Sequence, residues 1–334
     1  MRVFPHHAIV LLEDGAVSFC HYENPRCHAA APPQWMAEAL LSALLKRAQR
    51  EEISLTFLMG KTPPPPRLEK PIQGHAKIVP AALAARYPEA ILVLDGEDGP
   101  FPTLKASSER IVILRLARHD LPRCTALFEA LTGKFRRLSL HLTGIEYYGE
   151  AELALYAGEL EKMARRLALL CRAGSPVEVN VLTDRMMLSQ MRNCGAGTEH
   201  LTVAPDGRLY LCPGFLADGA APVGRFDAEQ GFVAGPVPRA DLKSAPICSR
   251  CDAFHCKRCL YLNERMTLER NIPSEQQCAL AHIEREASRQ LLNELGTLEP
   301  FRRMARIPEL TYRDPLECID LPPRASDPAT DAML

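Results

Sequence analysis

The stretch Ile111–Leu116, which reads Ile-Val-Ile-Leu-Arg-Leu, decides the fold class. It is nearly continuous in apolar residues, and the same is true of Ile91–Leu94 and Leu138–Leu142. Strands of a parallel sheet have this composition because helices cover both of their faces. Helical patterns at Pro122–Leu131 and Glu150–Cys171 separate the later strands. This alternation predicts an α/β domain with a parallel sheet, either open or closed into a partial (β/α) barrel.

The alternation extends from this stretch toward both ends of the domain. Asp14-Gly15 predicts a turn between the first two strands, and the Pro63–Pro66 run interrupts regular structure. The remaining predicted elements are strands at His7–Leu12, Ala16–Tyr22, Ser54–Met59 and Val177–Leu182, and a helix over Pro33–Glu52.

The pattern changes in the second half of the chain. Two alternating runs flank Pro205-Asp206-Gly207, which predicts a β-hairpin over His200–Leu211. Residues 213–247 are rich in Gly, Ala and Pro and are expected to form a loop. Ala279–Leu295 has the periodicity of an amphipathic helix. Its solvated charged face is expected to hold Glu284, Arg285, Glu286 and Arg289.

The length of 334 residues is typical of two domains. We expect an α/β domain over residues 1–187, a cysteine-rich module over 188–298 and a C-terminal tail over 299–334. The formal net charge of −1 gives no basic field for nucleic acid or an anionic membrane. The N-terminus lacks the charged and apolar regions of a signal peptide, and no stretch is long and apolar enough to span a membrane. A cytoplasmic location is therefore expected.

Twelve cysteines are many for a chain in a reducing compartment, where disulfides are disfavoured and clustered cysteines are usually metal ligands. Two Cys-X2-Cys pairs, Cys248/Cys251 and Cys256/Cys259, are separated by only four residues. Thiolates are soft donors that suit iron–sulfur clusters and zinc. Within one quarter of the chain lie seven of the cysteines: Cys194, Cys212, Cys248, Cys251, Cys256, Cys259 and Cys278.

Zinc is the competing interpretation, because four cysteines suffice for a structural zinc ion. Zinc ribbons separate their two pairs by about 15–20 residues, whereas a four-residue gap is cramped for one tetrahedral ion. Seven ligands fit two four-coordinate clusters with one site left open, or filled by another residue. Simple burial of free cysteines does not account for such local density. The spacing favours clusters over zinc.

The order of these cysteines resembles the SPASM module, the auxiliary-cluster domain of many radical SAM peptide-modifying enzymes. Cys194, Gly207 and Cys212 match its opening, with twelve and four residues between them. The family continues with CX2CX5CX3C and a last Cys, whereas this chain has CX2CX4CX2C and then Cys278. The resemblance covers about residues 190–285 and implies a partial-barrel domain of radical SAM type before it.

The resemblance also implies a division of the ligands between two [4Fe–4S] clusters. Cys194, Cys212 and Cys259 would hold the first cluster, for which no fourth ligand is evident. His200 and His255 lie close in sequence as candidates, although a lone histidine is more often a hydrogen-bonding residue of a loop or surface. The second cluster would be held by Cys248, Cys251, Cys256 and Cys278.

Active radical SAM enzymes carry a CX3CX2C motif after the first strand, and this chain does not. The corresponding region holds only Cys20 and Cys27, with His21 and His28 beside them. These residues could form a nonstandard three-ligand site, or a redox or zinc pair, or they could be remnants of a degenerate loop. The sequence therefore argues against cleavage of S-adenosylmethionine by this chain alone. Gly60-Lys61-Thr62 is discounted as a phosphate-binding loop, because the earlier glycine of that motif is missing.

More narrowly, the chain resembles the CXXX repeat peptide maturases. The resemblance implies a cysteine-repeat precursor peptide as substrate and a complete radical SAM maturase as protein partner, which this chain would assist. A self-sufficient maturase with a site at Cys20 and Cys27 is one alternative, and a zinc-stabilised binding module is another. The residues that suggest this family are Ser18–Pro25, Val181–Arg185, Cys194–Phe215, and Cys278 with His282–Arg285.

Overall fold

The computed structural model describes residues 5–191, 194–236, 242–245, 247–301 and 304–309. Within these residues the strands form one sheet of eleven, in the order β11-β10-β9-β8-β1-β2-β3-β4-β5-β6-β7. All pairings from β1 to β7 are parallel, and so is the pairing of β8 with β1. The last three pairings, from β8 to β11, are antiparallel. The α/β fold with a mainly parallel sheet is therefore confirmed.

The sheet is continuous across the expected boundary at residue 187, because β8 follows that boundary and pairs with β1. The hairpin predicted over His200–Leu211 is present as β8 and β9. The strands are β1 (His7–Leu11), β2 (Ser54–Leu58), β3 (Ala76–Pro80), β4 (Ile91–Asp95), β5 (Ser107–Leu116), β6 (Phe135–Leu142), β7 (Glu178–Val179), β8 (His200–Val203), β9 (Arg208–Tyr210), β10 (Gly224–Asp227) and β11 (Gly231–Ala234).

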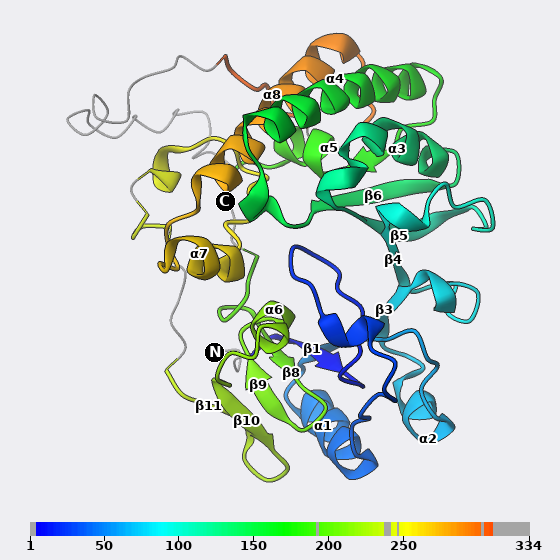
Figure 1. Cartoon of the computed structure of the whole chain (residues 1–334), viewed down its shortest axis with the longest axis vertical. Coiled ribbons are helices and arrows are strands. Elements are labelled where there is room, and N and C mark those ends of the chain that lie inside the picture. The colour runs from blue at the N-terminus through cyan, green and yellow to red at the C-terminus, as the bar shows by residue number, and fades with distance from the viewer. Residues whose placement is uncertain (1–4, 192–193, 237–241, 246, 302–303, 310–334) are drawn as a thin grey trace.

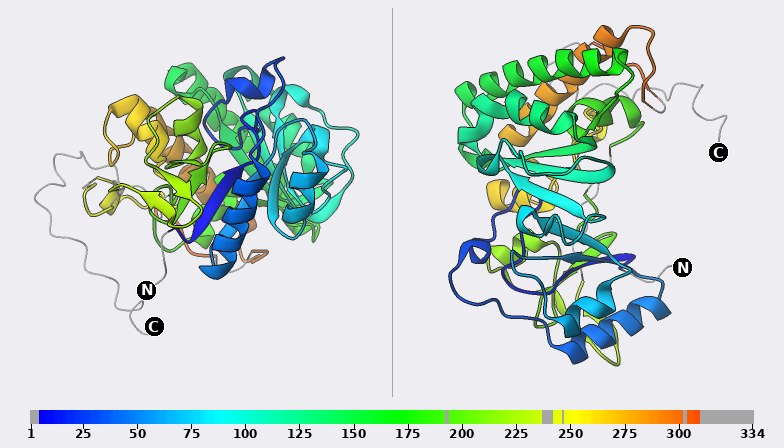
Figure 2. Two further views of the ribbon diagram at one scale, coloured as in Figure 1. Left: turned by 90° about the horizontal axis from the view of Figure 1, so that it is seen from below. Right: turned by 90° about the vertical axis from the view of Figure 1, so that its right-hand side faces the viewer.

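Helices connect the parallel strands and cover one face of the sheet (Figures 1 and 2). The α-helices are α1 (Glu38–Arg50), α2 (Pro66–Glu69), α3 (Cys124–Thr132), α4 (Glu150–Arg172), α5 (Asn180–Met187), α6 (Pro213–Ala217), α7 (Leu260–Thr267) and α8 (Glu275–Leu295). The 3-10 helices are η1 (Pro25–His28), η2 (Lys70–Ile72), η3 (Ala81–Leu83), η4 (Gly96–Asp98), η5 (Arg118–Arg123), η6 (Ile145–Tyr147) and η7 (Cys248–Arg250).

Alternate residues of each strand face the helices and form the main core, to which Val10, Phe57 and Leu114 belong. The residues between them point to the opposite face, where a smaller apolar group includes Ile9 and Ile113. Helix α8 packs beside α4 and α5, which lie far from it in the sequence (Figure 1). The helix that carries the last cysteine of the cysteine-rich region therefore shares the main core with the first half of the chain.

The strand predicted at Ala16–Tyr22 is wrong. Asp14-Gly15 does form a turn, but the chain then crosses the C-terminal ends of the strands as a loop. Two hydrogen bonds hold this loop in place. Val17 N donates to Met59 O at 2.8 Å, just after β2, and Asn24 Nδ2 donates to Ala16 O at 2.8 Å within the loop itself. This loop, residues 16–28, carries Cys20 and Cys27.

The strand predicted at Val177–Leu182 is reduced to two residues, and α5 begins at Asn180. The Asn180 side chain accepts from Leu140 N at 2.7 Å and donates to Leu140 O at 2.9 Å. These bonds replace the next pair of a strand ladder, and Thr183 Oγ1 then accepts from Val179 N at 3.0 Å. Side-chain competition of this kind ends the strand early.

Two further predictions need correction. Residues 213–247 were expected to be a loop, but they contain α6 and the hairpin β10–β11. Asp227 Oδ1 closes that hairpin by accepting from Glu229 N and Gln230 N at 2.9 Å each. The short strand β3 was not predicted. The helix expected over Pro33–Glu52 begins only at Glu38, because Met36 N is still bonded to Leu12 O alongside β1.

A search of the described residues finds no helix with the length and apolarity needed to cross a membrane.

Candidate functional site

The loop that contains Cys20 meets two segments of the cysteine-rich region. Gly214, two residues after Cys212, marks the meeting point, because a Cβ placed on it would stand 2.9 Å from the Tyr261 ring and 3.2 Å from Tyr22 Cβ. Tyr261 follows Cys259 by two residues, and Tyr22 follows Cys20 by two residues. Three cysteines from distant parts of the chain are thus carried into one region.

Cys194 joins the same region through its backbone. Its N–H donates to Lys257 O at 3.0 Å, which places it beside the segment between Cys256 and Cys259. Burial and then repulsion by the thiolates of Cys194, Cys20 and Cys212 raise the pKa of Cys259 well above its usual value. The structure therefore brings together Cys20, Cys194, Cys212 and Cys259, which we call the first cysteine group.

Burial raises the pKa of Cys20 to about 11, and it also raises the pKa of Cys212 and Cys259. Hydrogen bonding with the nearby backbone opposes the rise at all three cysteines, because it favours the thiolate form. A bound metal would reverse that balance, because a coordinating thiol is deprotonated.

The other four cysteines of the region, Cys248, Cys251, Cys256 and Cys278, lie together as a second cysteine group. Burial, followed by repulsion from Cys248 and Cys251, raises the pKa of Cys278 to about 11. The pKa of Cys256 rises to about 12 through burial and through repulsion from Cys278, against a hydrogen bond from the Arg258 backbone. Cys278 stands in the first turn of α8, and Cys248 begins η7.

One face of α8 supports this second group. His282 is one helical turn after Cys278, and its Nε2 lies 3.8 Å from Cys251 Sγ. Ala253 N donates to the same sulfur at 3.4 Å. Glu284 accepts from Tyr156 Oη at 2.9 Å and lies 3.2 Å from His255 Nε2.

Arg285 binds α8 to the segment that contains Cys251, through the neighbouring residue Asp252. It is completely buried, and its Nε and Nη2 each donate to one oxygen of Asp252 at 2.6 Å. Arg185 Nη2 donates to the same carboxylate at 3.1 Å. The two guanidinium groups hold the pKa of Asp252 below its usual range, although burial opposes them. The expectation of a solvated face is therefore wrong for Glu284 and Arg285, while Arg289 and Glu286 do form a local pair.

A buried cation lies at the C-terminal ends of the parallel strands, where barrel enzymes place their active sites. Arg115, at the end of β5, has a side chain only 4% exposed, and Nη1 donates to Asp95 Oδ1 at 2.8 Å. Its other donors bind Glu23 and the carbonyl oxygens of Cys20 (3.2 Å) and Tyr22 (3.1 Å). Arg115 thus fixes the loop of residues 16–28 over the strand ends.

Cys20 and Cys27 do not share one environment. Cys20 packs against the main core, whereas Cys27 packs against the apolar group on the opposite face of the sheet. Burial raises the pKa of Cys27, and the charge of Lys61 lowers it. Lys61 Nζ is also 3.3 Å from His28 Nδ1.

Gly60 is explained by close packing at this end of the sheet. A Cβ on Gly60 would lie 1.9 Å from Oε1 of Glu13, which is 2% exposed, and 2.9 Å from Gly15 O. Burial raises the pKa of Glu13 to about 7, against a hydrogen bond from the Gly60 backbone. The glycine of Gly60-Lys61-Thr62 therefore leaves room for a buried carboxylate.

Gly60→Ala is expected to lower the free energy of unfolding by about 1–3 kcal/mol, because the added methyl group overpacks Glu13. Urea unfolding of the full chain measures the change. Gly74→Ala is the matched control, since nothing lies within 4 Å of its added Cβ. Equal stability of the two variants would contradict this account of Gly60.

The remaining candidate residues lie elsewhere or outside these groups. His200 begins β8, where it pairs with His7 of β1; its N–H donates to Gly195 O at 3.1 Å, and its ring stands 6.0 Å from that of His7. His255 lies beside Glu284, on the side of the second group. Cys124 and Cys171 are buried in the helical layer, and Cys318 is outside the described residues.

Among the residues described, no set of three or more His, Cys, Asp or Glu side chains is placed to hold a single metal ion. An iron–sulfur cluster has a different requirement, since its own iron and sulfide atoms lie between the cysteines that bind it. The donor chemistry of both cysteine groups, four thiols each, fits such a cluster.

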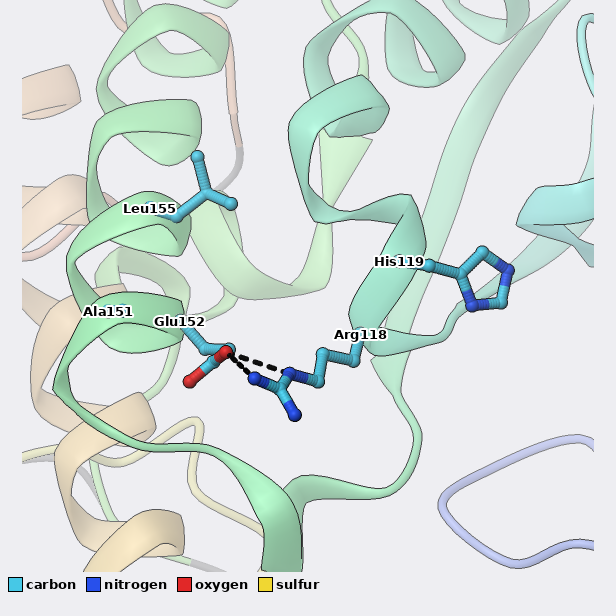
Figure 3. Close-up of a pocket in the computed structure, with 5 residues that line it drawn as sticks. All are labelled: Arg118, His119, Ala151, Glu152 and Leu155. Atoms are coloured by element: carbon cyan, nitrogen blue, oxygen red, sulfur yellow. Dashed lines mark hydrogen bonds and ion pairs between the residues drawn. The ribbon is translucent and has the colours of Figure 1, made fainter.

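A surface pocket of about 410 Å³ lies between η5 and α4 and contains no cysteine. Arg118 Nε donates to Glu152 Oε1 at 2.7 Å in its wall, while the His119 ring points away from this pair (Figure 3). A simple ion pair on an exposed wall gives this pocket no catalytic arrangement.

Comparison with known proteins gives similarity at the level of structure. No family model and no curated protein matches the chain. A structure of His6-tagged anSMEcpe with bound AdoMet matches with a TM-score of 0.56 and 12% identity, covering 86% of this chain and 98% of that chain. A structure of native anSMEcpe with bound AdoMet and Cp18Cys peptide matches with a TM-score of 0.56, 11% identity and the same coverage.

These similarities define the class of fold. The chain has an α/β fold with a mainly parallel sheet that resembles the radical SAM partial barrel, followed by a cysteine-rich region as in SPASM enzymes. The predicted fold class is thereby confirmed. At this level of identity the likeness concerns the fold, and the activity is argued from the site.

Proposed function

We propose that this chain is an iron–sulfur protein of peptide modification that carries two [4Fe–4S] clusters and assists a complete radical SAM partner. The observation that carries the proposal is the division of eight cysteines into two groups. They lie beside the C-terminal ends of the strands, over which Arg115 fixes the loop of residues 16–28. A cytoplasmic, reducing location is part of the proposal.

The cysteine groups support cluster binding through their chemistry. Burial raises the pKa values of Cys212, Cys256, Cys259 and Cys278, and repulsion between neighbouring thiolates adds to the rise. Iron bound to the sulfurs would offset that repulsion. When bound, such clusters supply one-electron transfer. The chain's own contribution is to bury the sulfurs and to hold the segments that carry them together.

The strand ends support an assisting role. Cleavage of S-adenosylmethionine requires a three-cysteine cluster in the loop after the first strand, as the resemblance implies. In this chain that loop is fixed by Arg115, and its two cysteines face different surroundings. We therefore propose that the radical is generated by the partner.

The proposed substrate is a cysteine-repeat precursor peptide. The family resemblance suggests it, and one structure of similar fold was solved with the Cp18Cys peptide bound. In this proposal the chain binds peptide, partner or both, with its clusters serving electron transfer.

Metal analysis of anaerobically reconstituted full chain tests the cluster proposal. We expect about eight iron and eight sulfide per chain, four of each for every [4Fe–4S] cluster, together with visible absorption. About two zinc ions without iron or sulfide would overturn the proposal in favour of a zinc-stabilised binding module.

A second measurement tests the assisting role. The reduced, reconstituted chain is incubated alone with S-adenosylmethionine, and 5′-deoxyadenosine is quantified. We expect no product above a no-protein control. Multiple turnovers by the chain alone would overturn the assisting role and favour a self-sufficient maturase.

A further inference from the structure

We propose that Cys20 is the fourth ligand of the cluster held by Cys194, Cys212 and Cys259. This inference rests on the proposed cluster function and names the ligand that the sequence leaves open. The loop after the first strand thereby supplies one ligand to the cluster of the first cysteine group.

The first support is the convergence of three chain segments on Gly214. The Tyr22 and Tyr261 side chains both lie against this glycine, so Cys20, Cys212 and Cys259 stand at equivalent distances along the chain from one contact point. The Phe215 and Tyr261 rings pack edge to face, 5.8 Å apart, beside it. Gly214 permits the approach, because any side chain there would overlap Tyr261.

The second support is the fixed position of the residues around Cys20. Arg115 Nε donates to Cys20 O at 3.2 Å, and His21 Nδ1 lies 2.8 Å from Leu142 O at the end of β6. Tyr22 is 2% exposed. The backbone around Cys20 is therefore held between the barrel and the cysteine-rich region.

This assignment accounts for the two cysteines of the loop separately. Cys20 joins the first cysteine group, while Cys27 remains on the opposite face of the sheet beside Lys61. Of the two cysteines in the loop, Cys20 is thus assigned to the cluster of the first cysteine group.

Reconstituted Cys20→Ala, Cys27→Ala, Cys194→Ala and Cys256→Ala variants of the full chain test the inference. Iron, sulfide and the electron paramagnetic resonance (EPR) spectrum of the reduced protein are measured. We expect Cys20→Ala to lose one to four irons of about eight, with the spectral change of Cys194→Ala and not that of Cys256→Ala. Cys27→Ala is expected to match the wild type.

The outcomes separate this inference from the proposed function. A wild-type chain without iron overturns both. A wild-type chain with two clusters, and a Cys20→Ala variant with the same iron content and EPR spectrum, overturns only the role of Cys20.

Alkylation of the wild type keeps the test independent of whether the variant folds. Iodoacetamide followed by mass spectrometry is applied to loaded and chelator-stripped protein. Cys20 is expected to be protected only in the loaded protein, whereas Cys27 reacts equally in both. Equal modification of Cys20 in the two forms would argue against ligation.

Discussion

Arg285→Met is expected to lower the free energy of unfolding by about 3–5 kcal/mol and to release the second cysteine group from α8. Arg285 is fully buried, and both oxygens of Asp252 accept from it at 2.6 Å. It also donates to Pro308 O at 2.8 Å. Removing the guanidinium therefore takes the donor from Asp252 Oδ1 and from the Pro308 carbonyl, and it leaves Asp252 Oδ2 with Arg185 alone.

The consequence for the cysteines follows from the position of Asp252, which is next to Cys251 in the chain. Without Arg285 the loop retains only Arg185 as an ionic partner of Asp252. The loop should then lose its fixed position on the helix that carries Cys278. We expect the second cluster to be lost more readily to a chelator, while the first is retained.

Urea unfolding and the rate of iron loss to a chelator measure these two effects. Arg289→Met on the same helix is the matched control, with an expected change below about 1 kcal/mol because its partner Glu286 lies near the surface. An Arg285→Met protein as stable as this control, with unchanged iron loss, would show that the buried ion pair is not needed.

Arg115→Met is expected to destabilise the chain by about 3 kcal/mol at pH 8. Methionine keeps most of the apolar stem but removes the donors to Cys20 O, Tyr22 O, Glu23 and Asp95. Two carbonyl groups and two carboxylates then lose a shared cation. The loop of residues 16–28 should exchange its amide hydrogens faster as a result.

This loss of stability should depend on pH. Burial raises the pKa of both Asp95 and Glu23, and Arg115 opposes that rise. Without Arg115 the two folded-state pKa values rise further above their unfolded values. The carboxylate part of the penalty is full above the folded-state pKa values of the variant and is lost as pH falls below those of the wild type. The difference from the wild type therefore narrows toward pH 4, where only the loss of the donors to the two carbonyl groups remains.

Urea unfolding at pH 8 and pH 5, with hydrogen exchange of residues 16–28, measures both effects. Arg118→Met is the control, since that arginine is exposed and pairs with Glu152 at the surface. A pH-independent difference between Arg115→Met and wild type would contradict the shared-cation account.

The parallel sheet could be predicted because its signal is local. Ile91–Leu94, Ile111–Leu116 and Leu138–Leu142 are apolar enough to require burial on both faces, and each is a strand in the structure. The failures at Ala16–Tyr22 and Val177–Leu182 have a physical cause. In both, side chains such as Asn24 and Asn180 bond to the backbone and compete with strand pairing.

The charged residues of the site were missed for a related reason. Arg285 is one of several charged residues on an amphipathic helix, and spacing alone does not say which of them is buried. Arg115 lies within an apolar strand, where alternation predicts its face but not its partners. Only the positions of Asp252, Glu23 and Asp95 in the fold identify these arginines as buried ion-pair residues.

The sequence by itself determined the cysteine-rich region, since the order of seven cysteines with Gly207 is a local and specific pattern. It could not determine where Cys20 belongs, because 173 residues lie between Cys20 and Cys194. The tertiary structure decided that point through the parallel pairing of β8 with β1, which brings the second half of the chain beside the loop after the first strand. Sheet pairing between distant segments depends on the whole fold, and no local spacing encodes it.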